Sequence, residues 1–560
     1  MSAGLEKSFI LGFGAGLVGL GLNGLLIDVF EASKVAYTLW ILMGISLAIV
    51  VLNLKSKLDL LPELKKAATS TYAVVFYLLG IILLVYLPIA GNFFNGDDFT
   101  WLRWAAQSTF NPLAYFTDSA GFFFRPGTKI YFDLMFHTFW LNPTIYHLVS
   151  IALHFFVAVL FFLLAKKIFQ NTLLAIFASI GFLILSGYSE VVFWISATGY
   201  LFNVMFALSG LLFFIIWDET KKPYYYILSF AAFSFCLLFH ELGVVLPLLV
   251  LSYRIKDLNW NIRSFFEQFK KADFLALFIP VIFYLLLRFL AGSHWFSGDY
   301  NYDLVKLPFN VVGNLLGYGA ISSLGPSVLG AYESIRIFLR GNILLSIVLV
   351  LSGIASLVFL IRSTKSYFNN KEKRVLFFGF TFFIISLLPF LGLGNITFRY
   401  SYLATMGMVF ILVVLFKKVY NFLLENGRNV ALVSLTVLLL LYGLFHLISF
   451  QQTAANWAGA SFRVKNFFIS FDSYYRDYWS QDELEFHFVD VPIRRGEAWI
   501  FPVGLPDAVW FAVRNDKADV FIDKDVNAAL QNIENPLKDK IFIFTDLGML
   551  EEVKINTKNR

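Results

Sequence analysis

Residues 144–165 read TIYHLVSIALHFFVAVLFFLLA, a run without Asp, Glu, Lys or Arg that is followed directly by Lys166 and Lys167. About 20 consecutive apolar residues are enough for a helix to cross the hydrocarbon core of a bilayer. Lipid offers no hydrogen-bond partners to the backbone, so such a segment must be helical. We therefore predict a transmembrane helix at this position.

Comparable runs recur along the whole chain. Of its 560 residues, 58% are hydrophobic and only 15% are charged, whereas soluble domains have about 25% charged residues. This composition excludes a soluble protein and predicts an all-α polytopic membrane protein with about 13 transmembrane helices. The predicted helices are residues 8–30, 36–54, 71–90, 144–165, 172–187, 195–217, 224–239, 242–253, 273–292, 343–361, 375–392, 402–416 and 429–449.

Basic residues concentrate in the short segments between these runs. Cytoplasmic loops of membrane proteins carry an excess of Lys and Arg, so these segments predict a cytoplasmic N-terminus and an extracytoplasmic C-terminal domain. The same rule accounts for the net charge of +6 without a nucleic-acid partner, and basic loops also favour anionic lipid headgroups. The residues concerned are Lys55, Lys57, Lys65, Lys66, Lys166, Lys167, Lys221, Lys222, Arg254, Lys256, Lys270, Lys271, Lys365, Lys371, Lys373, Arg374, Lys417 and Lys418.

Two further apolar segments are predicted to stay on the outer side. If residues 127–140 crossed the bilayer, Lys166 and Lys167 would move outside, so we expect a helix on the outer surface or partway into the membrane. The same reasoning makes residues 304–340 an outer, partly re-entrant segment.

The chain divides into three predicted parts. Residues 1–66 hold two extra N-terminal helices, and residues 67–450 form the transmembrane core with a long first outer loop at 91–125. Residues 451–560 are long enough for a small mixed α/β domain, with a helix at 460–479 and strands at 498–501, 508–513, 520–522 and 540–544. The glycines of the first predicted helix form a small-residue surface that can pack helices or bind a partner subunit.

The sequence Asn95-Gly96-Asp97-Asp98 begins the first outer loop and contains two adjacent carboxylates. One carboxylate could accept a proton from an acceptor hydroxyl, and Asp98 could hold a divalent cation such as Mg²⁺ or Mn²⁺. The alternative is a solvated turn, because Asn, Gly and Asp are typical turn residues.

Arg125 ends the same loop. Its guanidinium group could bind a lipid phosphate through two parallel hydrogen bonds, or the residue could simply anchor the chain at the membrane interface. His147 and His154 are seven residues apart and share one face of the predicted helix at 144–165. They are candidates for acid–base chemistry or phosphate binding, although packing within the helix bundle explains isolated histidines equally well.

Three more polar positions fall at outer helix ends. They are Glu190, the pair His240-Glu241, and Arg399. Each alone could be a capping or snorkelling residue, and Arg288 near the end of its helix is expected to snorkel. Because the predicted topology places them all on one side of the membrane, we predict one polar site at the outer leaflet.

This ordered series of short motifs resembles the GT-C fold glycosyltransferases, in particular the protein O-mannosyltransferase and transmembrane TPR-containing mannosyltransferase branch. The likeness runs from about Asn92 to Phe416 and includes Asp97-Asp98, Phe124-Arg125-Pro126 and Arg399-Tyr-Ser-Tyr402. His240 replaces the lysine of that branch's Lys-Glu motif, and TPR repeats are missing from the sequence.

The resemblance implies an inverting enzyme that transfers a sugar from a polyprenyl-phosphate-linked donor to a protein, lipid or glycan acceptor on the outer face. Asp97 and Asp98 would carry the chemistry, and Arg125 and Arg399 would bind the donor phosphate. The alternatives are a secondary transporter or flippase of a lipid-linked substrate, which would place its site near the midplane in repeated halves, and a non-catalytic membrane scaffold.

Overall fold

The computed structural model describes residues 66–109, 111–119, 123–256, 262–293, 302–342, 344–345, 347–349, 351–352, 367–480, 483–536 and 538–554. The chain divides into two units, Met1–Tyr77 and Leu78–Arg560, and apart from the start of the first helix the features below belong to the second unit. The helices predicted at 8–30 and 36–54 lie outside the described residues, as does most of the one at 343–361.

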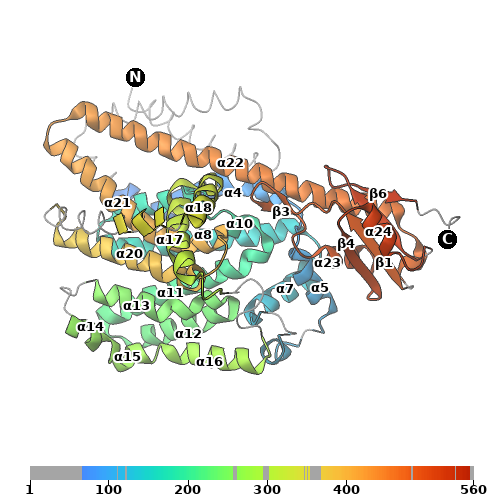
Figure 1. The fold of residues 1–560 in the computed structure, drawn as a ribbon. Coiled ribbons are helices and arrows are strands. Elements are labelled where there is room, and N and C mark those ends of the chain that lie inside the picture. Colours follow the sequence, from blue (N-terminus) through green and yellow to red (C-terminus); the bar gives the residue numbers. More distant parts are fainter. Residues whose placement is uncertain are drawn as a thin grey trace, which may run out of the picture. The chain divides into compact units, whose positions relative to one another are not determined.

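The described part of the chain is mostly helical (Figure 1), and seven of its helices are long and apolar enough to cross a membrane. Each of the seven coincides with a predicted transmembrane segment. The chain therefore has the long apolar helices of a membrane protein. They are Thr71–Gly91 (α4, Thr71–Tyr86, with a 3-10 turn), Pro143–Phe169 (α8), Ile195–Thr220 (mainly α11, Thr198–Thr220), Ala272–Leu290 (α15, Ala272–Leu275, and α16, Phe278–Leu290), Asn370–Leu391 (α20), Phe398–Glu425 (mainly α21, Ser401–Glu425) and Asn429–Tyr474 (α22).

Three predicted transmembrane segments form shorter helices, so the count of about 13 is not confirmed. The prediction at 172–187 becomes α9 (Thr172–Ile184), because the backbone is already extended at Leu185. The prediction at 224–239 becomes α12 (Pro223–Phe239), which ends where His240 is extended. The prediction at 242–253 becomes a 3-10 turn followed by α13 (Leu246–Ile255).

The two segments predicted to lie on the outer side are helical, and neither is among the seven long apolar helices. Residues 127–140 form α7 (Pro126–Phe139), which buries both apolar and polar side chains. Residues 304–340 form α17 (Leu307–Leu324) and α18 (Val328–Gly341), which pack against each other. Four further short helices precede α22 in the described part of the chain: α5 (Asp98–Gln107), α6 (Ala114–Thr117), α10 (Glu190–Phe193) and α14 (Ile262–Phe269).

Helices α20 and α21 show how closely the apolar helices pack. A Cβ atom at Gly407 would lie 2.7 Å from the carbonyl oxygen of Gly379, and one at Gly379 would lie 2.9 Å from that of Gly407. Only glycine allows two helix backbones to approach this closely, which is a common basis for packing in membranes.

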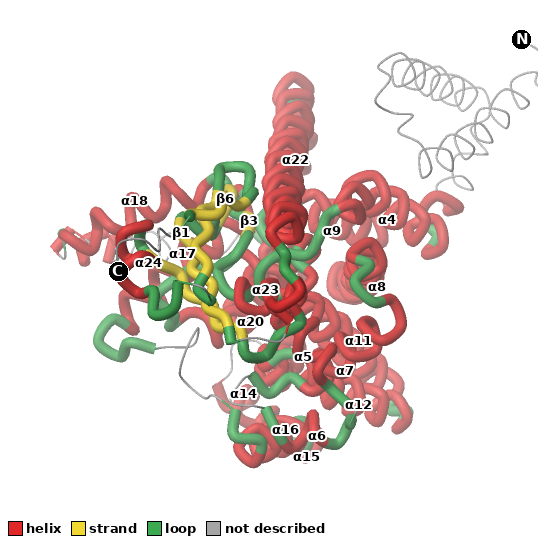
Figure 2. Tube along the Cα trace, turned by 90° about the vertical axis from the view of Figure 1, so that its right-hand side faces the viewer, coloured by secondary structure: helices red, strands yellow, loops and turns green. Residues whose placement is uncertain are grey.

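The C-terminal region is built around the end of α22. This helix has 46 residues and continues without a break past residue 450, the predicted end of the core. Four strands, drawn in yellow in Figure 2, form a sheet in the order β4-β1-β5-β6, with β1 parallel to β4 and β5, and β6 antiparallel to β5. The strands are β1 (Leu484–Val489), β4 (Ala518–Asp523), β5 (Lys540–Phe544) and β6 (Leu550–Val553), and a separate hairpin joins β2 (Arg494–Arg495) to β3 (Ala498–Trp499).

The two faces of the sheet are covered by different helices. Phenylalanines of β1 and β5 pack against Phe467 and Phe471 of α22. On the other side, α24 (Val526–Asn532) packs Ala529 against Val489 and Ile541. Successive side chains of β1 thus point alternately toward α22 and toward α24, and both faces of the strand are covered.

The prediction of a mixed α/β region is confirmed, with one wrong element. The helix predicted at 460–479 is largely the end of α22, and the strands predicted at 498–501, 520–522 and 540–544 correspond to β3, β4 and β5. The strand predicted at 508–513 is wrong, because these residues belong to helix α23 (Leu505–Val513). Gly504 has a left-handed backbone and Pro506 stands in the first turn, a combination that favours the start of a helix.

Candidate functional site

The two adjacent carboxylates lie at the start of α5 in different environments. Asp98 is buried, and its carboxylate accepts hydrogen bonds from the backbone N–H of Asn95 (2.8 Å) and of Ser196 (2.7 Å), and from the Ser196 hydroxyl. Burial raises the pKa of Asp98 to about 7, while these hydrogen bonds act in the opposite direction. Because protein donors engage both oxygens, Asp98 holds the turn of residues 95–98 in place.

Asp97 has a different position. It precedes α5 as its N-cap residue, its side chain makes no capping hydrogen bond, and it is only partly buried. Its backbone carbonyl accepts from the amides of Thr100 and Trp101. The backbone of Asp97 is therefore fixed by the helix, while its carboxylate is not used to cap the helix.

The C-terminal region lies directly against this turn. Gly96 has φ +48°, and a Cβ there would lie 3.0 Å from Cδ of Pro502. A Cβ at Gly504 would lie 2.3 Å from the carbonyl oxygen of Gly96, which leaves no room for a side chain. The Thr100 hydroxyl donates to Asp507 at 2.6 Å. The loop after β3 and the start of α23 thus support the carboxylate turn.

Arg125 forms a bidentate ion pair with Glu241. Its Nε and Nη2 atoms donate to the two carboxylate oxygens at 2.9 and 2.6 Å, and both side chains are largely buried. The guanidinium also lies over the ring of Phe123, 4.4 Å from its centroid. This pair connects the start of α7 to the segment between α12 and α13, as the bidentate geometry of arginine permits.

Arg399 forms a second pair with Glu190. Its Nη1 donates to Oε1 at 2.9 Å and its backbone N–H donates to Oε2 at 3.1 Å. Trp499 of β3 donates its indole N–H to the same Oε1 at 3.2 Å. Glu190 is 2% exposed, so three donors from two distant parts of the chain stabilise one buried carboxylate.

The two pairs belong to one group of charges. His240 interacts electrostatically with Glu241, Arg125, Arg399 and Arg288. Burial lowers the pKa of His240 to about 3, so its imidazole is neutral, and its Nδ1 accepts from the Leu242 amide at 3.1 Å.

Arg494 of β2 interacts with Glu190 and Arg399 and stacks on Trp499, 3.6 Å from the ring centroid. We call Arg125, Arg288, Arg399 and Arg494, with Glu190, Glu241 and His240, the arginine cluster. Even when Glu333, which also interacts with Arg494, is included, the arginines outnumber the carboxylates.

Trp194 and Ser196 connect the arginine cluster to the carboxylate turn. The Trp194 indole N–H donates to the carbonyl of Asn95 at 3.4 Å, and its ring lies below the guanidinium of Arg399 at 5.4 Å. Ser196, two residues further on, binds Asp98. The segment between α10 and α11 thus contacts both groups of predicted site residues.

The two histidines of α8 are both buried. His147 lies beside the backbone of Asn92 and Phe93, immediately before the carboxylate turn. His154 lies two helical turns further along, where its Nδ1 is 2.7 Å from the Tyr402 hydroxyl and its ring contacts Tyr86. His147 is therefore near the candidate site, and His154 packs within the helix bundle.

Several residues of the site were not predicted from the sequence. Arg288 is 7% exposed and lies in the arginine cluster, instead of snorkelling to a surface. Arg494 and Trp499 come from the C-terminal region, and Ser196 binds Asp98. The sequence around Arg288 is apolar and that around Arg494 and Trp499 is mixed, and neither pattern reveals the partner of these side chains.

No known protein family matches the sequence, and no curated protein is significantly similar to it.

Proposed function

We propose that this protein is a membrane glycosyltransferase that takes its sugar from a polyprenyl-phosphate-linked donor. The arginine cluster beside the carboxylate turn is the observation that carries this proposal. A base for a hydroxyl group and a concentration of positive charge for a phosphate are the two requirements of such a transfer. The acceptor would be a hydroxyl of a protein, a lipid or a glycan.

In the proposed reaction the acceptor oxygen attacks the anomeric carbon of the donor sugar. The bond between that carbon and the phosphate oxygen breaks, and polyprenyl phosphate leaves with the bonding electrons. Asp97 is assigned to take the proton of the acceptor hydroxyl, because protein donors engage both oxygens of the adjacent Asp98. A single displacement of this kind inverts the configuration at the anomeric carbon.

The proposed role of the arginines is to stabilise the negative charge of the departing phosphate. Glu241 and Glu190 orient Arg125 and Arg399 through their ion pairs, so the guanidinium groups need little reorganisation during the reaction. Asp98, a candidate ligand of Mg²⁺ or Mn²⁺ from the sequence, is assigned to holding the turn, because protein donors engage its oxygens.

A test of donor binding follows from the two ion pairs. Arg125→Lys and Arg399→Lys should each weaken binding of polyprenyl phosphate by at least about tenfold, because lysine keeps the charge but loses the planar fork. Binding would be measured by native mass spectrometry of the full chain in detergent, with uncharged polyprenol as the reference ligand.

The matched control is Arg254→Lys. Arg254 is also a buried arginine that pairs with carboxylates, Asp273 and Asp218, but it lies outside the arginine cluster. The Arg254→Lys variant should leave donor binding unchanged. Equal binding by wild type and by a variant with alanine at both Arg125 and Arg399 would remove these arginines from the proposed role. Movement of the lipid across vesicles without sugar transfer would favour the flippase alternative.

The proposal also requires the site to face outward. The loop charges predict that the end of the chain after Arg560 is extracytoplasmic, so alkaline phosphatase fused there should be active. They predict that Lys167 and Lys418 are cytoplasmic, so green fluorescent protein fused at these positions should fluoresce. Alkaline phosphatase and green fluorescent protein fusions would measure the two states. A fluorescent C-terminal fusion would contradict the predicted topology and the outer-leaflet site together.

A further inference from the structure

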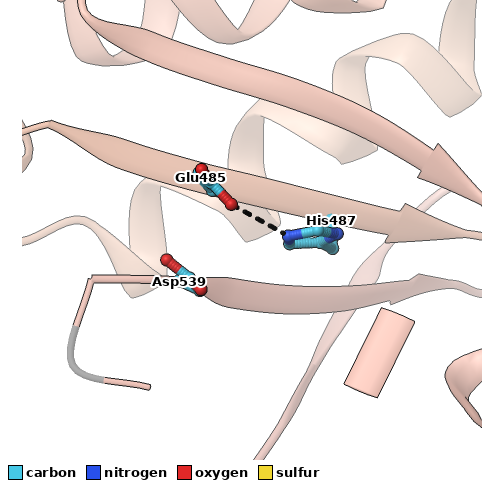
Figure 3. A group of neighbouring side chains, drawn as sticks. All are labelled: Glu485, His487 and Asp539. Atoms are coloured by element: carbon cyan, nitrogen blue, oxygen red, sulfur yellow. Dashed lines mark ion pairs between the residues drawn. The ribbon is translucent and has the colours of Figure 1, made fainter. Parts of the chain in front are cut away.

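Three potential metal ligands meet on the α24 side of the C-terminal sheet, apart from the proposed catalytic site. Glu485 and His487 are on β1, and Asp539 directly precedes β5. One ligand atom from each of the three lies within 4.8 Å of the others. Figure 3 shows the carboxylate of Glu485 facing the imidazole of His487, with Asp539 at the start of the neighbouring strand.

The strand register explains why these side chains converge. In the parallel pair of β1 and β5, Phe486 is opposite Lys540. Their preceding residues, Glu485 and Asp539, therefore share the opposite face of the sheet, as does His487 two residues from Glu485. The arrangement is thus a consequence of the sheet and does not depend on a long flexible loop.

His487 is oriented as a metal ligand would be. Its Nδ1 is 2.8 Å from Oδ2 of Asp523, and its ring stacks on Phe521. The side chain is 2% exposed, and Nε2 has no hydrogen-bond partner among the described residues. A carboxylate on one ring nitrogen fixes the proton there and leaves the other nitrogen as a donor to a metal.

We propose that Glu485, His487 and Asp539 bind a divalent first-row transition ion, with Zn²⁺ as the principal candidate. Nε2 of His487 lies 3.6 Å from Oε2 of Glu485. With the ring proton on Nδ1, the lone pair of Nε2 is available to a cation that also contacts the carboxylates of Glu485 and Asp539.

The ligand set selects the class of ion. An imidazole with two carboxylates suits Zn²⁺ and neighbouring transition ions, whereas Mg²⁺ and Ca²⁺ prefer oxygen ligands alone. Three protein ligands leave a fourth position for water.

The experiment is a metal titration of the full chain in detergent after treatment with a chelator. We expect one Zn²⁺ per chain, Mg²⁺ that does not compete, and visible absorption bands when Co²⁺ replaces Zn²⁺. His487→Gln and Asp539→Asn should each weaken Zn²⁺ binding at least about tenfold, and Asp523→Asn should weaken it about 10- to 100-fold by releasing the imidazole.

Asp546→Asn is the matched control, because Asp546 is an exposed carboxylate of the same region; it should bind Zn²⁺ like the wild type. Circular dichroism and thermal unfolding would confirm that each variant is folded. Glu485→Gln is the variant least expected to disturb folding, because Glu485 is partly exposed. If the wild type binds no Zn²⁺ at micromolar concentration, the proposal is overturned. Wild-type affinity in a folded variant carrying both Glu485→Gln and Asp539→Asn would overturn it as well. Neither result depends on glycosyl transfer.

Discussion

Replacing Asp97 with asparagine should lower the rate of sugar transfer by at least about 10²-fold, because asparagine has nearly the same shape but cannot take the acceptor's proton. Folding should be little affected, since asparagine has nearly the same size and shape as aspartate and Asp97 is only partly buried. The measurement is turnover of a panel of polyprenyl-phosphate sugars by the full chain in nanodiscs, together with the thermal unfolding midpoint.

The neighbouring carboxylates provide the controls. Asp118→Asn changes an exposed carboxylate of the same first loop and should leave turnover unchanged. Asp98→Asn should act differently from Asp97→Asn, because an amide nitrogen in place of one oxygen would face the donors of Asn95 or Ser196 and reduce stability. Turnover near the wild-type rate in a chain carrying both Asp97→Asn and Asp98→Asn would refute the proposed mechanism.

Replacing Glu190 with glutamine should lower the free energy of unfolding by about 3 kcal/mol. Loss of the negative charge leaves Arg399 without its ion-pair partner, and breaking a buried pair on one side costs about 3–5 kcal/mol. We expect the lower end of this range because the Arg399 side chain is 19% exposed. Unfolding of the full chain by denaturant in detergent micelles would measure the change.

Glu425→Gln is the control for this experiment, because Glu425 is an exposed carboxylate at the end of α21. It should change the free energy of unfolding by less than about 0.5 kcal/mol. A variant that also replaces Arg399 with methionine should recover part of the loss, since the charge of Arg399 is then removed together with that of its partner. A loss below about 1 kcal/mol in Glu190→Gln would contradict a structural role for the pair.

The long apolar helices were predictable because length and composition suffice to identify them. Residues 144–165 need no tertiary partner to be recognised as α8, since lipid and the backbone impose the helix. The shorter helices α9, α12 and α13 were harder to interpret. Their ends are set by local backbone geometry at Leu185 and His240, which hydrophobicity does not report.

The candidate site was predictable only in part. The charged residues Arg125, Glu190, Glu241 and Arg399 were recognisable because ionisable groups near apolar helices are costly unless they are paired. Their partners were not, because Trp499 reaches Glu190 from 309 residues away. The strand β1, which carries His487, was missed, and α23 was predicted as a strand because its apolar run fits either structure.

Helix α22 has a consequence for how the membrane acts on the protein. Its 46 residues give a length of about 70 Å, against a hydrocarbon core of about 30 Å. Asn456, in the second half of this helix, donates to Glu497 of the turn between β2 and β3 at 2.9 Å, and β3 carries Trp499 to Glu190. Apolar helices tilt to match the thickness of the surrounding lipid. One continuous helix thus joins an apolar half long enough to span the bilayer to the polar region that carries Trp499, so we expect the depth of α22 in the membrane and the Trp499–Glu190 contact to be mechanically linked.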